Sequence, residues 1–363
     1  MASPTLQTLA DLAGVSKSTV SMALRNHPNV ASKTRERIQT LAREQGYRPN
    51  PQVAHLMAHI RNARPADRQA VIAFLSRFPS VEALKASSRE RRESYEGAVA
   101  RADRLGYRID HFTLEPTPGS CRRISEVLQA RGIRTVILGP QNGMTPQIEL
   151  AWECFSIATL GFSAFKPAMH RAVRNAYMDM HLALKRLRQS GHRRIGLVIR
   201  ADEDQRTLYS YSAALLVLNR HLDPAERVPV LSESAITPEA FLRWVETNEP
   251  DAIVSFDGRE AGWLEEAGIR VPRDLSLVNL CLDPATSAGS GVCPHWGRLG
   301  GMAVDLAVAT TQRNETGIPT DPGLSLVHGY WVDGASHRVR GPDLVASTVY
   351  YADLGGHGAS VLA

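Results

Sequence analysis

The sequence lacks the features of secreted, membrane-spanning and disulfide-stabilised proteins. Its 363 residues include four cysteines, which are far apart and form no C-x-x-C pair. We therefore expect buried thiols in a reducing cytoplasm rather than disulfides or a zinc finger. Apolar runs such as Ala70–Leu75 and Ala213–Leu218 have the length of core segments and fall well short of the roughly 18 residues of a membrane span. The first residues have no basic or apolar signal region, so export is not expected.

Catalytic and cofactor motifs are also missing. The sequence contains no G-x-S-x-G elbow, no G-x-x-x-x-G-K-[ST] loop, no G-x-G-x-x-G turn and no H-E-x-x-H pair. Its histidines show no spacing typical of metal ligands. We therefore expect neither an enzyme nor a bound metal or cofactor.

The positive charge is concentrated near the N-terminus. The whole chain has a formal net charge of +5, with Lys+Arg 42 against Asp+Glu 37. Residues 1–64 contain nine basic and three acidic residues, a net charge of +6, which leaves −1 for the rest. A basic segment on a nearly neutral chain of this length predicts a nucleic-acid-binding head attached to a separate body.

Residues 5–26 have the pattern of two short helices joined by a tight turn. Gly14 is expected to end the first helix, Val15 to fill the turn, and Ser16 to cap the second helix. The first helix has apolar residues at three- and four-residue spacing: Leu6, Leu9, Ala10 and Ala13. The second helix has these inward positions: Val20, Ala23 and Leu24. This arrangement is typical of a helix-turn-helix unit.

The alternative is a helical hairpin inside a larger helical domain. Against it, the outward face of the second helix is polar and basic, with no acid: Lys17, Ser18, Thr19, Ser21 and Arg25. A third amphipathic helix, roughly Ser32–Gln45 with Ile38, Leu41 and Ala42 inward, completes a minimal core. These features favour DNA binding.

Residues 5–60 resemble the DNA-binding head of the LacI/GalR family of transcriptional regulators. The motifs that carry the resemblance are Thr5, Ala10, Ala13-Gly14-Val15-Ser16, Thr19-Val20-Ser21, Asn29-Val30 and Gly46-Tyr47-Arg48-Pro49-Asn50. The resemblance implies a near-palindromic double-stranded DNA operator, a homodimer, a cytoplasmic location and no membrane association. It implies repression as the mode of regulation.

The resemblance also implies roles for residues of the head. Base reading falls to Lys17, Ser18 and Met22, where Lys suits guanine and Met a thymine methyl. Many relatives carry Arg or His at the Met22 position. The positions expected to hold the DNA backbone are Ser16, Thr19, Ser21, Asn29 and Arg35.

A hinge is predicted after the head. Asn50 followed by Pro51 is a helix start, and the ten residues Gln52–Arg61 carry an apolar face. Such a short helix is marginal alone, so we expect it to form when paired with its copy or on DNA. By resemblance, Leu56, with Met57 as second candidate, enters the minor groove and bends the duplex. The alternative is that Leu56 packs against the body.

From residue 70 the pattern changes to strands alternating with helices, which predicts a parallel α/β sheet. The expected strands are Val71–Leu75, Tyr107–Thr113, Thr135–Leu138, Ser156–Leu160, Arg194–Ile199, Ala252–Ser255 and Leu275–Leu280. The expected helices include Tyr95–Leu105, Ile124–Arg131, Met178–Gln189 and Thr237–Glu246. Several segments up to about His337 resemble the two-lobed, doubly wound periplasmic-binding-protein type I domain. The predicted division is a head over 1–49, a hinge over 50–64, an effector-binding and dimerisation domain over 65–340 and a flexible tail over 341–363.

A small-molecule effector is expected at the carboxyl ends of the strands, in the cleft between two lobes. The candidate lining residues are Ser76, Phe78, Phe162, Arg206, Asp257, Cys281 and Trp296. The alternatives are core positions for both phenylalanines and a solvated Arg206. Many sugar-responsive relatives carry Asp where Cys281 falls, and the segment Phe256–Leu264 is shorter here, so a sugar is only one candidate effector. A solute-binding transport protein would share the body, but it would have no use for the basic head.

Overall fold

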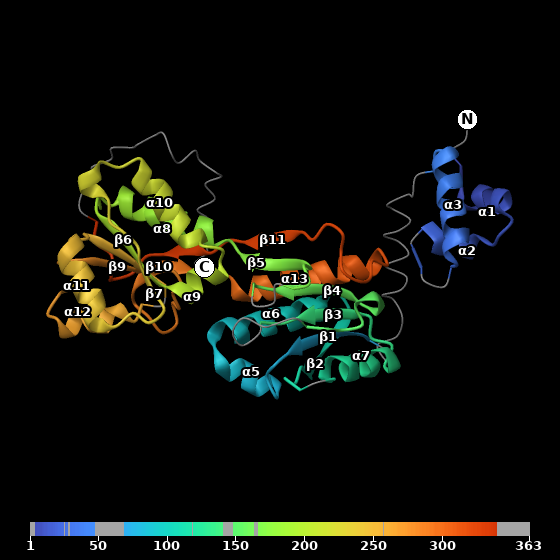
Figure 1. The fold of residues 1–363 in the computed structure, drawn as a ribbon, viewed down its shortest axis with the longest axis horizontal. Helices are drawn as coiled ribbons and strands as arrows, with labels where there is room; N and C mark the ends of the chain where they lie inside the picture. Colours follow the sequence, from blue (N-terminus) through green and yellow to red (C-terminus); the bar gives the residue numbers. More distant parts are fainter. Residues whose placement is uncertain are drawn as a thin grey trace. The chain divides into compact units, whose positions relative to one another are not determined.

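The computed structural model describes residues 4–24, 26–27, 30–47, 69–117, 119–140, 148–162, 166–256 and 258–339 (Figure 1). The chain divides into two compact units, one formed by the residues up to Val173 with Trp296–Ser325 and the other by Arg174–His295 with the residues from Leu326. The first unit begins with a helical head. The predicted hinge over 50–64, with Leu56 and Met57, and the tail over 341–363 lie outside the described residues.

Three helices form the head. They are α1 (Leu6–Ala13), α2 (Lys17–Leu24) and α3 (Ser32–Glu44). Thr5 caps α1, since its hydroxyl accepts a hydrogen bond from the Thr8 N–H and Thr8 reciprocates. Gly14 ends α1 in the left-handed conformation at φ 64°, which confirms the predicted helix end.

The head has its own small core. Leu9, Val20 and Ile38, one from each helix, are completely buried. Ala10 is buried to 2% exposure, and its small side chain allows the close packing of α1 in this core. Leu24 and Leu41, both predicted to face inward, are only partly buried against this core. The predicted three-helix arrangement is therefore confirmed.

The rest of unit 1 is built on a six-stranded sheet with strand order β11-β5-β4-β3-β1-β2. Its strands are β1 (Ala70–Ser76), β2 (Tyr107–Thr113), β3 (Thr135–Leu138), β4 (Ser156–Leu160), β5 (His170–Arg174) and β11 (Leu324–Val327). The pairings from β2 through β5 are all parallel. Its helices are α5 (Val81–Ser87), α6 (Arg89–Arg104), α7 (Ser120–Ala130) and α13 (Trp296–Gln312), with a 3-10 turn η2 (Trp152–Cys154).

Both faces of this sheet are covered. Ala73 and Leu75 of β1 share a core with Leu128 of α7. The ring of Phe74, which points to the opposite face, meets the Tyr95 ring of α6 edge to face at 5.0 Å between centroids. On that face α6 and α13 cross so closely that a Cβ on Gly97 or Gly300 would collide with the backbone of the other helix.

Unit 2 holds a second six-stranded sheet with strand order β12-β10-β9-β8-β6-β7. Its strands are β6 (Ile195–Arg200), β7 (Leu231–Glu233), β8 (Ala252–Ser255), β9 (Ser276–Asn279), β10 (Ser290–Cys293) and β12 (Tyr330–Val332). Among the described residues, β12 pairs antiparallel with β10, and the other strand pairs of this sheet are parallel. Its helices are α8 (Ala176–Gln189), α9 (Ala201–Arg206), α10 (Ser210–Arg220), α11 (Pro238–Asn248) and α12 (Glu260–Glu266), with η3 (Pro224–Glu226).

The alternation of side chains along the strands of unit 2 explains its layers. Leu197 of β6 packs into a core with α8 and α10, whereas the next residue, Val198, packs into a core with α11 and α12. Two parallel α/β sheets thus follow the head, as predicted. No helix in the described ranges is long and apolar enough to cross a membrane.

Some element boundaries and strands differ from the sequence prediction. The strand predicted from Arg194 begins at Ile195, and the Arg194 N–H instead donates to the Asp251 carboxylate at 3.2 Å. The helix predicted from Tyr95 already begins at Arg89, since Ser88 caps it and its arginine-rich first turn lacks apolar spacing. Strand β5 was not predicted, because the buried Arg171 interrupts its apolar residues.

Candidate DNA interface and effector site

The first turn of α2 presents exposed polar side chains that the head itself does not use. The hydroxyl of Ser16 accepts a hydrogen bond from the Thr19 N–H at 3.1 Å, which caps α2 as predicted. Lys17 and Ser18 follow it, are exposed, and make no side-chain hydrogen bond to another described residue. A helix N-terminus also carries unpaired N–H groups, so this turn combines a cation, hydroxyls and backbone donors.

The other predicted DNA-contacting residues of α2 are partly buried in the head. Thr19 and Ser21 are half-buried, and the Thr19 hydroxyl lies 2.9 Å from that of Ser16. Met22 is also half-buried and packs against the head core. Met22 therefore contributes to the packing of the head as well as to its outer surface.

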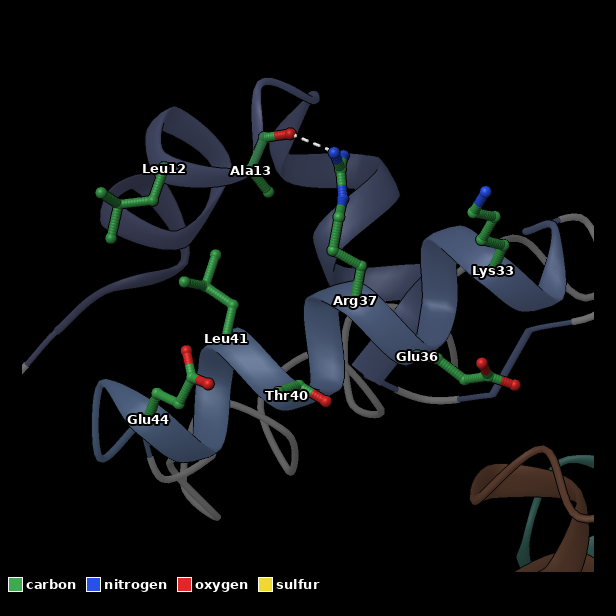
Figure 2. Close-up of a pocket in the computed structure, with 8 residues that line it drawn as sticks. All are labelled: Leu12, Ala13, Lys33, Glu36, Arg37, Thr40, Leu41 and Glu44. Carbon is green, nitrogen blue, oxygen red and sulfur yellow. Dashed lines mark hydrogen bonds between the residues drawn. The ribbon is translucent and has the colours of Figure 1, made fainter.

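Two arginines of α3 connect the helices. Arg35, predicted to hold the DNA backbone, is half-buried and its Nη1 lies 3.5 Å from the Asn26 carbonyl oxygen. Arg37, whose role is not predicted from the sequence, donates from Nη2 to the Ala13 carbonyl at 2.8 Å (Figure 2). That bond satisfies a carbonyl at the end of α1. Asn29 lies outside the described residues.

A groove of about 420 Å³ lies between α1 and α3. Figure 2 shows Leu41 extending from α3 toward α1. The lining residues are Leu12, Ala13, Lys33, Glu36, Arg37, Thr40, Leu41 and Glu44. Because two acids accompany the two cations, this groove lacks the single-sign charge that favours a phosphate backbone. The exposed turn of α2 is the better candidate for contact with DNA.

In unit 1 the predicted effector residues at the end of β1 already contact other residues of the unit. Ser76 is completely buried, and its hydroxyl lies 2.8 Å from His111 Nε2 and accepts a bond from the Phe78 N–H at 3.2 Å. Burial lowers the pKa of His111, which favours the neutral imidazole. Phe78 is half-buried, with the Arg91 guanidinium 5.2 Å from its ring centroid.

The other two candidates in unit 1 are packed against their surroundings. Phe162 follows β4 and is half-buried, and the guanidinium of Arg171 lies 5.4 Å from its ring centroid. Arg171 in turn donates to the Gly161 carbonyl at 2.7 Å, and its burial lowers its pKa. Trp296 is the first residue of α13 and is buried, with 8% exposure.

In unit 2, Cys281 is half-buried and belongs to a polar cluster with Arg174 and Asp179. Arg174 donates from Nη1 to the Cys281 thiol at 3.1 Å, and it also contacts the Asp179 carboxylate and the Leu280 carbonyl. The second oxygen of Asp179 accepts a bond from the Gly329 N–H at 2.8 Å. Arg174 and Asp179 are not predicted from the sequence, because no local motif places them beside Cys281.

Arg206, at the end of α9, is the predicted effector residue with unused hydrogen-bonding capacity. It is half-buried, and its Nε is buried with no hydrogen-bond partner among the described residues. Strands β6 and β9 both run parallel to β8, so Arg206 and Cys281, which follow β6 and β9, lie beyond the same edge of the sheet. A buried donor without a partner is costly, and a ligand would relieve that cost. Asp257, the remaining candidate, lies outside the described residues.

Two family models match different parts of the chain. Residues 5–50 match the lacI family of bacterial regulatory proteins. Residues 184–336 match the periplasmic binding protein-like domain. The first match covers the helical head, and the second covers most of unit 2.

The chain is also similar to known regulators over most of its length. It is 23% identical over 285 residues to the HTH-type transcriptional regulator DegA of Bacillus subtilis (strain 168), which covers 76% of this chain and 80% of DegA. A structure of the transcriptional regulator CelR in complex with cellobiose matches with a TM-score of 0.54 and 19% identity, over 92% of this chain and 99% of CelR.

The lac repressor dimer bound to operator and the anti-inducer ONPF matches with a TM-score of 0.54 and 18% identity, over the same shares of the two chains. The two structural similarities establish the fold, and the sequence matches establish the relationship. The helix-turn-helix head, the periplasmic-binding-protein-like domain and the similarity to DegA identify the chain as a member of the LacI family of DNA-binding transcriptional regulators.

Proposed function

We propose that this regulator is a cytoplasmic repressor that binds a near-palindromic operator as a homodimer and responds to a small molecule bound by its α/β domain. The observation that carries the proposal is the exposed first turn of α2, where Lys17 and Ser18 have no partner within the described residues. A dimer of such heads would present two recognition helices to two half-sites.

In this proposal Lys17, Ser18 and Met22 read bases in the major groove. Lys17 donates to a guanine, Ser18 donates or accepts, and Met22 touches a thymine methyl with the part of its side chain that the head core leaves exposed. The residues proposed to hold phosphates are Ser16, Thr19, Ser21, Asn29 and Arg35. Phosphate contacts fix the orientation of the head, and base contacts select the sequence.

We further propose that the segment after the head bends the operator. Leu56, or Met57 beside it, would enter the minor groove between two bases once two hinge segments pair on DNA. The effector would act by favouring one of two states of the protein that differ in their affinity for DNA. Rotation within the α/β domain is the proposed route.

The effector is proposed to contact residues at the carboxyl ends of the strands. The unused donor of Arg206 supports this for unit 2, and Asp257 and Cys281 follow neighbouring strands. For unit 1 we propose contacts from Ser76, Phe78, Phe162 and Trp296. The structurally similar regulator CelR is known in complex with cellobiose, so sugars are the first effectors to test. A sugar at 100 times its dissociation constant should stabilise the protein by about 2.7 kcal/mol in a thermal-shift assay.

Equilibrium binding to DNA tests the proposed function. We expect the full chain to bind a palindrome upstream of its own gene, with an affinity that falls steeply as salt rises because phosphate contacts release counterions. A chain lacking residues 1–64 should lose this binding. Salt-insensitive binding, or retention of the DNA without the head, would contradict the proposal.

A further inference from the structure

Helix α10 is apolar on two sides. On its inner side Tyr211, Ala214 and Leu215 are buried in the core that α10 shares with α8. On its outer side Leu216 is 60% exposed and Val217 is 42% exposed. A surface helix ordinarily places polar residues on its outer side, so this face has the character of a covered surface.

The outer residues form a continuous stripe. We define the α10 outer face by four residues at helical spacing: Tyr209, Ala213, Leu216 and Val217. Tyr209 directly precedes the helix, is 56% exposed and adopts a positive φ of 58°. A single exposed leucine would need no explanation, but three large apolar side chains on one stripe favour a binding partner.

The chain leaves unit 2 beside the end of α8. The Leu277 N–H donates to the Ser336 carbonyl at 2.8 Å, and the Arg338 N–H donates to the Ser276 hydroxyl at 3.0 Å. His337 Nε2 lies 2.7 Å from the hydroxyl of Ser190, which caps the C-terminal end of α8. The last described residues are therefore held in place at this end of α8.

The segment that follows α10 also lies near the C-terminal end of α8. Arg188 of α8 is paired with Glu226 of η3 at 3.4 Å, and η3 begins shortly after the last residue of α10, Arg220. Helices α8 and α10 also pack against each other (Figure 1). A chain that continues from Val339 therefore starts near the C-terminal ends of both helices.

The segment beyond this exit suits the α10 outer face. Residues 341–363 contain two aspartates and no Lys or Arg. Their largest apolar residues are Leu344, Val345, Val349, Tyr350, Tyr351, Leu354, Val361 and Leu362. The two helix ends at the exit carry exposed cations, among them Arg186 and Arg220. The acidic and apolar residues of this segment thus complement the cations at the helix ends and the apolar side chains of the α10 outer face.

The segment beyond Val339 is long enough to reach the α10 outer face. The eleven residues that follow Val339, up to Tyr350, can extend over about 36 Å at roughly 3.3 Å per residue. Helix α10 has 11 residues, which corresponds to a length of about 16 Å. The tail can therefore run along the whole helix and still bring its two tyrosines to the outer face.

We propose that the C-terminal tail of this chain, through residues 344–354, binds along the α10 outer face. Its apolar side chains would cover Leu216 and Val217, and Asp343 and Asp353 would lie among the cations at the helix ends. In this proposal the tail is bound, whereas the sequence alone predicts a flexible tail. Helix α10 follows α9, whose last residue is Arg206, so a bound tail would also connect the C-terminus to the region proposed for the effector.

Chymotrypsin cleavage of the full chain tests this proposal, since Tyr350 and Tyr351 are adjacent cleavage sites. In the native protein we expect cleavage there to be at least about tenfold slower than in Leu216→Glu, because proteolysis follows the population of the released tail. Leu216 is exposed, so this substitution should leave the thermal unfolding of the protein unchanged. Val127→Glu is the matched control, since Val127 is 37% exposed on α7 of the other unit, and it should cleave at the native rate.

A substitution in the tail gives an independent reading of the same contact. Val349→Asp should accelerate cleavage as much as Leu216→Glu, and the double variant should cleave no faster than either one. Equal cleavage of the native chain and Leu216→Glu would overturn the proposal. A change of association state in Leu216→Glu with no change in tail cleavage, measured by sedimentation velocity, would also overturn it and assign the face to a second copy of the chain.

Discussion

Several predicted functional residues are exposed in the head, whereas several in the α/β domain are hydrogen-bonded within the fold. In the head, Lys17 and Ser18 are exposed on a capped helix and make no side-chain hydrogen bond to another described residue. In the α/β domain, Ser76 and Cys281 are held by His111 and Arg174 in networks inside their own units. The head therefore separates residues that build the fold from residues available for a ligand, whereas the α/β domain uses several residues for both.

Substitutions in the two regions should therefore differ in their effects on stability. A substitution at the exposed turn of α2 should change DNA binding with little effect on folding. A substitution within the buried networks should change stability as well as any ligand response. Four variants test this contrast, from the largest expected effect to the smallest.

The largest effect is expected for Val20→Asp. Val20 is completely buried in the small head core, and an unpaired buried charge costs about 3–5 kcal/mol, comparable to the whole stability expected of so small a domain. DNA binding should be lost while the thermal unfolding of the α/β domain stays unchanged. Leu12→Asp is the control, because Leu12 is 56% exposed and this variant should keep a folded, DNA-binding head. Loss of binding in both variants would show that charge, and not the head core, decides the outcome.

A smaller effect is expected for Leu56→Ala. Removing the proposed minor-groove side chain should weaken operator binding at least tenfold, about 1.4 kcal/mol, while binding to random-sequence DNA changes less, because only the bent operator complex uses the inserted side chain. Binding isotherms on the two duplexes give the ratio. Equal losses on both would favour the alternative in which Leu56 packs against the body.

Asp251→Asn tests a structural network in unit 2. Burial acts to raise the pKa of Asp251, but His192, 3.4 Å away, and the N–H groups of Arg193 and Arg194 outweigh burial and hold the pKa below its usual value. The carboxylate therefore stabilises the fold above the unfolded pKa of about 3.9, and this contribution is lost as the pH falls through the lower folded pKa. We expect the variant to be about 1–3 kcal/mol less stable at pH 7.

Denaturant unfolding across pH checks this prediction. The difference between native protein and Asp251→Asn should be largest near neutrality and should shrink below about pH 4. Asp321→Asn is the control, since the Asp321 side chain is exposed. A stability difference that stays constant through acid pH would mean that packing, and not the charge of Asp251, explains the loss.

The smallest effect is expected for Ser16→Ala, compared with Thr5→Ala. Both side chains cap a helix of the head, with cap hydrogen bonds of 3.1 Å and 3.2 Å, so each variant should lose about 1 kcal/mol of stability. Only Ser16 is also proposed to hold a phosphate, so only Ser16→Ala should in addition weaken DNA binding under conditions where both heads are folded. Equal DNA affinities of the two variants would limit Ser16 to capping.

Much of the head could be predicted from sequence because its signals are local. Gly14 at a helix end, Ser16 at a helix start and apolar residues at helical spacing each act over a few residues. The parallel strands were also largely predictable, because buried strands such as Thr135–Leu138 consist mainly of β-branched and apolar residues. Strand β5 was missed since the buried Arg171 interrupts its pattern.

The networks of the α/β domain could not be predicted in the same way. Arg174, Asp179 and Cys281 meet only because the chain topology brings β9 and the start of α8 together. The outward Leu216 and Val217 were also missed, since an apolar run such as Ala213–Leu218 gives no sign that part of it faces away from the core. Contacts between distant segments depend on the fold, which no short motif encodes.

The most direct test of the central claim, that the exposed turn of α2 reads the operator, compares Lys17→Ala with Arg43→Ala. Both variants remove one positive charge from the head, but Arg43 lies near the end of α3 and bonds there to Gln39 and Thr40. The affinities for operator and for random-sequence DNA give the specificity of each variant. We predict that Lys17→Ala loses about 1–3 kcal/mol of specificity and that Arg43→Ala keeps the native value. Equal specificity in the two variants would contradict the account.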